Sequence, residues 1–71
     1  MKYAVVIEKT RTGYSAYAPD VPGVGVTART VARVKKLLAE AIALQIEGLQ
    51  QDGLPIPRPT TRTDYVEAHA A

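Results

Sequence analysis

A single long helix constrains what this chain can fold into. Residues 30–52 contain no proline and, apart from Gly48, no glycine. The segment's apolar residues recur three or four positions apart, which is the repeat of one helix face. Thr30 is a suitable N-cap, and Gly53 followed by Pro55 is typical of a helix end. We therefore predict a helix over residues 30–52, whose apolar face is formed by Val31, Val34, Leu38, Ile42, Ile46 and Leu49.

This helix carries a second apolar row, formed by Leu37, Ala41 and Leu44. The two rows together cover roughly 200° of the helix surface. A helix packed on one side of a sheet needs little more than about 100°. A chain of 71 residues without cysteine also has only a marginal core of its own. We therefore predict a homodimer or higher homo-oligomer, with Leu37, Leu44 and the polar Gln45 as interface residues.

Short strands are expected before the helix, over residues 2–8, 14–18 and 25–28, and after it, over residues 63–67. Residues 2–8 are apolar on both faces, which favours a strand inside a sheet. Alternating prolines make residues 54–59 an extended connector. A right-handed helical crossover would place the last strand parallel to the first and beside it. The expected fold is a single α+β domain over residues 1–71, βββαβ, with sheet order 3-2-1-4 and the helix on one face.

Catalytic residues are not expected. The candidate carboxylates of Glu8, Asp20, Asp64 and Glu67 do not form the convergent set that a two-metal nuclease needs. Asp20 lies between two prolines and is expected to cap local N–H groups as a turn residue. His69 is the only histidine and lies near the end of the chain, and Ser15 has no histidine to activate it. We predict a protein that is not an enzyme and that needs neither a cofactor nor a metal ion.

Residues 13–23, GYSAYAPDVPG, resemble a characteristic stretch of the HicB-like antitoxin family. The resemblance extends over about residues 2–66 and includes the helix and the proline connector. It implies a partial RNase H-like fold and a protein-interaction module that binds and occludes a small HicA-like mRNA-cleaving toxin. The residues expected at a partner or oligomer interface are Tyr14, Tyr17, Asp20, Pro22 and Gly23, together with Leu37, Leu44 and Gln45 of the helix.

The chain departs from the family pattern at three places. Val24 stands where the family usually has cysteine, and residues 28–30 read Ala-Arg-Thr instead of Gly-Asp-Thr. Ala32 and Arg33 replace an acidic first helical turn. Many family members also carry a C-terminal DNA-binding segment, and the expectation here is a short stand-alone domain without one.

A basic group at the helix start supports an alternative function. Arg29, Arg33, Lys35 and Lys36 could contact phosphates together with the helix N-terminus, as in a nucleic-acid-binding protein. They could equally form a solvated helix face. The net charge of +2 permits a nucleic-acid partner without favouring it strongly. No signal peptide or membrane-spanning run is recognisable, so the expected location is the cytoplasm and no membrane contact is expected.

Overall fold

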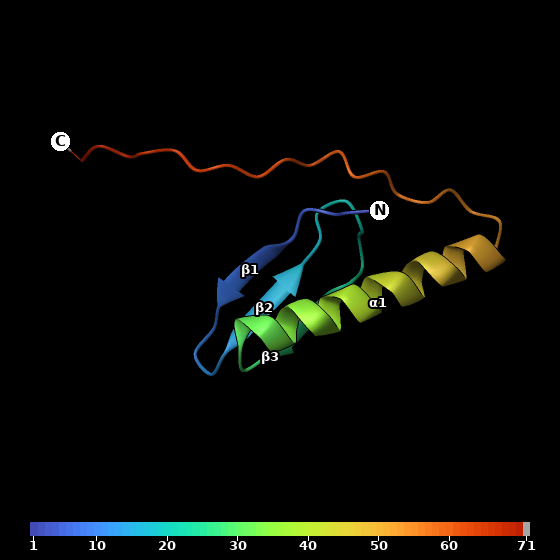
Figure 1. Cartoon of the computed structure of the whole chain (residues 1–71), viewed down its shortest axis with the longest axis horizontal. Coiled ribbons are helices and arrows are strands. Elements are labelled where there is room, and N and C mark those ends of the chain that lie inside the picture. The colour runs from blue at the N-terminus through green and yellow to red at the C-terminus, as the bar shows by residue number, and fades with distance from the viewer. Residues whose placement is uncertain (71) are drawn as a thin grey trace.

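The computed structural model describes residues 1–70 and contains a three-stranded sheet and one helix. The elements follow in the order β1 (Val6–Lys9), β2 (Tyr14–Tyr17), β3 (Gly25–Ala28) and α1 (Val31–Gln51). The strands form an antiparallel meander with spatial order β1-β2-β3. Helix α1 packs against β2 and β3 on one face of this sheet (Figure 1). The α+β class is therefore confirmed.

Both ends of α1 are capped as the sequence predicts. Thr30 has an extended backbone, and its Oγ1 accepts a hydrogen bond from the Arg33 N–H at 3.1 Å. At the other end Gly53 adopts φ 67°, in the left-handed region that favours glycine. The N–H of Leu54 donates to the carbonyl of Leu49 at 2.9 Å, and that of Gly53 donates to Gln50 at 3.1 Å. This pair of bonds is a Schellman cap.

The core lies between α1 and one face of the sheet. Strand register aligns Ile7, Ala16 and Val26 in one cross-strand row. The row packs in the core, and its central residue, Ala16, is small enough for the helix to lie close to β2. Since the chain has no Phe or Trp, short aliphatic side chains fill this space. The buried core residues are Ala16, Ala18, Val21, Val34, Leu38 and Ile42.

The predicted fourth strand is absent. Residues 54–70 are extended but belong to no strand, so the four-stranded sheet with order 3-2-1-4 is wrong. Figure 1 shows this segment returning from the end of α1 on the β1 side of the sheet and continuing past the β1–β2 hairpin. Strand β1 is consequently an edge strand. It also begins at Val6 and not at the predicted Lys2.

Candidate interaction surfaces

Asp20, in the loop between β2 and β3, holds the segment that follows the proline connector. Its Oδ2 accepts hydrogen bonds from the N–H groups of Thr60 and Thr61 at 3.0 and 2.9 Å. Its Oδ1 accepts from the hydroxyls of the same residues at 3.1 and 2.7 Å. We call these three residues the connector anchor. The prediction that Asp20 caps local N–H groups is wrong, because these partners lie about forty residues away.

The connector anchor also changes the acidity of Asp20. The N–H and hydroxyl of Thr61 stabilise the carboxylate, followed by the weaker effect of Thr60, and partial burial opposes them. The pKa of Asp20 is therefore held below its ordinary value of 3.8. The anchor is accordingly complete at neutral pH.

A second contact ties the connector to the start of the chain. The Tyr3 hydroxyl donates to the carbonyl of Pro57 at 2.7 Å. Sequence reasoning missed this contact and the role of the two threonines. A Thr-Thr pair after a proline connector does not indicate which acceptor it will meet, so the sequence offered no usable signal.

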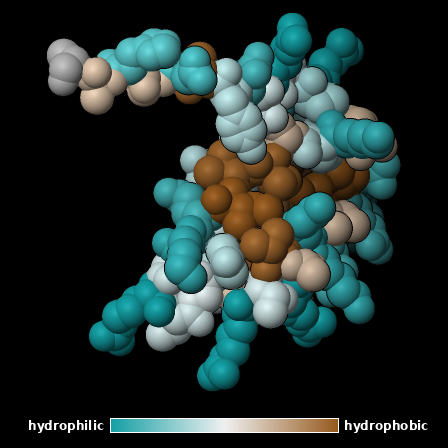
Figure 2. Space-filling model, turned by 60° about the vertical axis from the view of Figure 1, so that its left-hand side comes forward, coloured by the Kyte–Doolittle hydropathy of each residue, from teal (hydrophilic) through white to brown (hydrophobic). Residues whose placement is uncertain are grey.

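An apolar groove opens between the N-terminal segment and α1. The helix packs on β2 and β3, so the part of the sheet face nearest β1 is covered less completely. The groove has a volume of about 750 Å³. Figure 2 shows hydrophobic side chains gathered in the middle of one face of the molecule and surrounded by hydrophilic ones. The apolar lining of the groove includes Met1, Tyr3, Val5, Ile42, Ile46 and Ile56.

The second apolar row of α1 lies on the outer side of the helix. Leu37 and Ala41 are half-buried, whereas Leu44 is 71% exposed and Gln45 is exposed. We call Leu37, Ala41, Leu44 and Gln45 the outer helix row. The exposure of Leu44 leaves an apolar side chain free to pack against another molecule. That the row forms an interface stays a prediction.

The residues predicted to contact a partner do not form one continuous surface. Tyr14 and Tyr17 lie three positions apart on β2 and so point to opposite faces of the sheet. Tyr14 packs against the core, with the Lys9 Nζ 5.2 Å from its ring centroid. Tyr17 is 43% exposed on the face that α1 does not cover. It leads into the β2–β3 loop that carries Asp20, Pro22 and Gly23.

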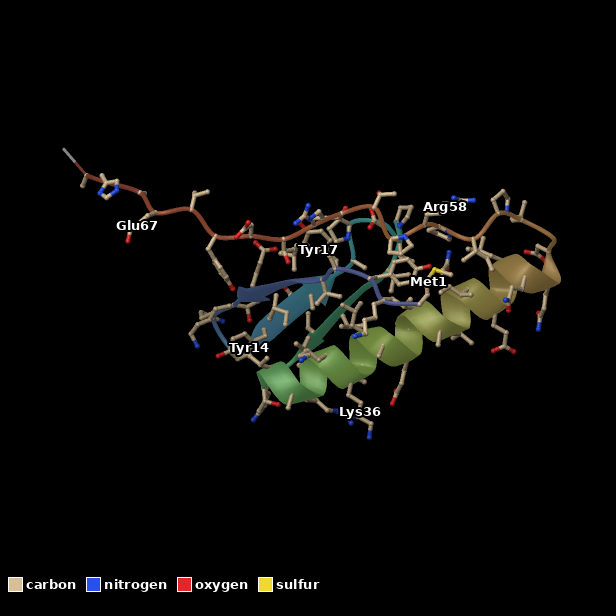
Figure 3. All side chains as sticks on the ribbon, turned by 45° about the horizontal axis from the view of Figure 1, so that its top comes forward. Met1, Tyr14, Tyr17, Lys36, Arg58 and Glu67 are labelled. Atoms are coloured by element: carbon tan, nitrogen blue, oxygen red, sulfur yellow. The ribbon has the colours of Figure 1, made fainter. Side chains whose placement is uncertain are left out.

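The basic residues at the helix start are divided between two sides of α1. Arg29, Arg33 and Lys36 are exposed, and Lys36 projects away from the sheet (Figure 3). Lys35 instead lines the apolar groove. The first turn of α1 contains no acidic residue, and within residues 1–70 none of these four cations forms an ion pair. The structure therefore does not gather them into one cluster.

Two further observations concern residues 1–70 as a whole. In this range no three His, Cys, Asp or Glu side chains come together as a group that could hold a metal ion. The only helix in the same range, α1, is not apolar enough over its length to span a membrane.

Comparison with known proteins identifies the family. A chain of a solved HicA3 and HicB3 toxin-antitoxin complex is 37% identical and superposes with a TM-score of 0.70, covering 84% of this chain and 70% of that one. An uncharacterized 14.9 kDa protein from the rep-hol intergenic region of Haemophilus phage HP1 (strain HP1c1) is 33% identical over 66 residues. That match covers 93% of this chain and 50% of the phage protein, so the chain spans half the length of this relative. The model of the HicB-like antitoxins of bacterial toxin-antitoxin systems matches residues 3–70, and the chain therefore belongs to this family.

Proposed function

We propose that this chain binds a HicA-like toxin and occludes its RNA-cleaving surface without catalysing a reaction itself. The observation that carries the proposal is the likeness, at 37% identity, to a chain of the HicA3 and HicB3 complex. The composition of the surface agrees with a binding role, because it offers exposed apolar and aromatic side chains and a loop stiffened by proline. Inhibition would then be steric.

The face carrying Tyr17 is the surface that we assign to the toxin. Tyr17 is 43% exposed, and the adjoining loop presents Pro22 and Gly23 at the surface. The connector anchor fixes one side of this loop, since Asp20 is bonded to Thr60 and Thr61. A rigid loop next to an exposed tyrosine loses little conformational entropy when a partner binds.

Purified HicA3, or a small basic HicA-like protein from the same genome, provides the test. Calorimetry should detect binding to the wild-type chain, and the complex should protect a short RNA from cleavage. Tyr17→Ala should weaken binding by roughly tenfold or more, as expected for an aromatic residue central to an interface. Leu54→Ala is the control, because Leu54 is 52% exposed just after the end of α1 and belongs to none of the proposed interfaces. No binding to either toxin would overturn the proposal.

We also propose that the chain associates with itself through the outer helix row. Its support is the exposure of Leu44 on a helix whose opposite side already packs in the core. Sedimentation equilibrium of the wild-type chain and of Leu44→Asp tests this directly. A lower mass for the variant supports the outer helix row as an interface. Equal masses for the two proteins would show that the outer helix row is not an interface.

A nucleic-acid-binding function is the second candidate. It is favoured by the three exposed cations Arg29, Arg33 and Lys36, which have no carboxylate partner within residues 1–70. Phosphate contacts of this kind would make affinity for a short RNA fall steeply with salt. A fluorescence titration at two salt concentrations decides the matter. Absent or salt-independent binding would exclude this function.

A further inference from the structure

Residues 62–70 leave the body of the molecule as an exposed extended tail. All nine are exposed, and Tyr65 and Val66 reach 92% and 93%. The hydrogen bond and ion pair found within the tail are local, joining Tyr65 to Asp64 and His69 to Glu67. Two adjacent large side chains are thus held in water, which is unfavourable for a chain whose core is small.

The sequence of the tail is nevertheless that of a strand. Residues 63–67 read TDYVE, with threonine, tyrosine and valine, which are the residue types enriched in strands. Proline and glycine are absent from residues 60–70. The strand predicted here is therefore not prevented by its own residues. What it lacks in its own chain is a neighbouring strand.

The outer edge of β1 offers the backbone groups that such a strand needs. β1 is at the edge of the sheet, and no other strand of residues 1–70 covers it. The apolar groove lies on the same side of the sheet face, where Tyr3 and Val5 contribute to its lining. A strand added at this edge would bond to the backbone of β1 and direct alternate side chains over the groove.

The connector anchor holds the tail away from this edge in its own chain. Four hydrogen bonds to Asp20 fix Thr60 and Thr61, and the Tyr3 hydroxyl fixes Pro57. Figures 1 and 3 show the chain leaving this point on the β1 side and continuing beyond the hairpin without joining the sheet. The tail is thereby held outward, where a second molecule can receive it.

Length and charge both suit a second copy of this chain as the receiver. Residues 62–67 span about 20 Å when extended, and the four residues of β1 span about 13 Å, so the tail can cover the whole strand. Residues 62–67 carry the carboxylates of Asp64 and Glu67 against the one cation of Arg62, a net charge of −1. The segment around β1 carries more basic than acidic side chains, namely Lys2, Lys9 and Arg11 against Glu8.

We infer that two copies of this chain exchange tails, so that residues 62–67 of one copy pair with the free edge of β1 in the other. This inference rests on the proposal that the chain associates with itself, and the contact that it assigns does not involve the outer helix row. Each copy gives a strand and receives one, which makes the contact symmetric and closed. Of the adjacent pair Tyr65 and Val66, the side chain that faces the groove then leaves water, and the exposed edge of β1 is covered.

Mixed disulfide formation tests the exchange directly. The chain contains no cysteine, so single Val6→Cys chains can be mixed with chains carrying Tyr65→Cys or Asp64→Cys and then oxidised. A disulfide between the two different chains is expected, and it can form only between molecules. As a matched control, Ala70→Cys lies beyond the paired segment and should link much less. Equal linking of all tail positions, or none, would overturn the exchange.

Measurement of the solution mass tests this inference independently of the proposed toxin binding. Val66→Pro removes a backbone N–H within the paired segment, whereas Ala70→Pro makes the same kind of change outside it. We expect Val66→Pro alone to lower the mass measured by sedimentation, with circular dichroism unchanged, since residue 66 is 93% exposed in the single chain. If Val66→Pro keeps the wild-type oligomer, the exchange is wrong and self-association stands. If the wild-type chain is a monomer at all concentrations, both the tail exchange and the self-association are wrong. Toxin binding is tested separately by calorimetry.

Discussion

Thr61 and Asp20 are joined by two hydrogen bonds, one from the Thr61 N–H and one from its hydroxyl, at 2.9 and 2.7 Å. The pair connects the β2–β3 loop to a segment 41 residues further along the chain. Together with the hydrogen bonds from Thr60 to Asp20 and from the Tyr3 hydroxyl to Pro57, this contact fixes residues 57–61 against the body. It therefore controls both the rigidity of the loop and the direction of the tail.

Asp20→Ala should release the connector while leaving the sheet and α1 folded. The variant leaves four donors of Thr60 and Thr61 without their acceptor. Amide hydrogen exchange at these two residues should become about five- to tenfold faster, the effect of losing one or two net hydrogen bonds. Asp64→Ala is the matched control, since that carboxylate bonds only to the adjacent Tyr65 N–H. Unchanged amide hydrogen exchange at Thr60 and Thr61 in Asp20→Ala would show that the prolines alone hold the connector.

Acid should open the same contact without a mutation. The pKa of Asp20 is lowered in the folded chain, chiefly by the Thr61 N–H, so folding favours the ionised form. The stabilisation is complete above the ordinary pKa of 3.8 and is lost as the pH falls through the lower, folded pKa. The Thr61 amide should therefore stay protected at pH 5 and lose protection only in strong acid. Asp20→Asn should remove this pH dependence, and the same acid transition in that variant would show that another group controls the contact.

The sequence predicted those parts of the fold that depend on local interactions. The apolar repeat and the caps at Thr30 and Gly53 determine α1, which the structure places at Val31–Gln51. The hairpin residues Thr10 and Gly13 bond to each other and close the turn between the first two strands, which were predicted over residues 2–8 and 14–18. All of these contacts lie within a few residues along the chain.

The wrong predictions concern parts of the fold that depend on contacts between residues far apart in the sequence. The strand at residues 63–67 has strand-like composition, but a strand forms only where a neighbour is within reach. The bond from Asp20 to Thr61 directs the segment elsewhere, and no pattern in either segment identified that pairing. The separation of Tyr14 from Tyr17 has a local cause instead, because the alternation along β2 places them on opposite faces.

Gly13→Ala should destabilise the chain through a backbone collision. A Cβ at this position would lie 2.3 Å from the carbonyl oxygen of Ala28 and 2.9 Å from the Cα of Arg29. The hairpin and the end of β3 must then move apart, at a cost of about 1–3 kcal/mol in the free energy of unfolding. The measurement is urea denaturation followed by circular dichroism.

Gly48→Ala is the matched control for that experiment. It is also a glycine-to-alanine change, but a Cβ at this helical position meets nothing within 4 Å. Alanine is favoured over glycine inside a helix, so the variant should gain about 0.5–1 kcal/mol. Destabilisation of similar size at both sites would contradict the close approach described for Gly13.

Leu38 and Leu44 lie on the same helix, but truncation to alanine should change the free energy of unfolding much more at Leu38 than at Leu44. Leu38 is 1% exposed in the core, so Leu38→Ala should cost about 2–5 kcal/mol in the free energy of unfolding. A chain of this size has only about 4–11 kcal/mol in total, and the variant should therefore unfold at a much lower urea concentration than the wild type. Leu44 is 71% exposed, and Leu44→Ala should change the stability of dilute protein by less than about 0.5 kcal/mol.

The distinction between the two leucines extends to self-association. Leu44→Ala should lower the oligomer population at high protein concentration, because it removes the exposed side chain of the outer helix row. Denaturation midpoints measured over a range of concentrations reveal this, since an oligomer becomes more stable as concentration rises. The wild-type midpoint should rise with concentration and the midpoint of Leu44→Ala should rise less. Parallel concentration dependence in the two proteins would show that the outer helix row contacts no second copy.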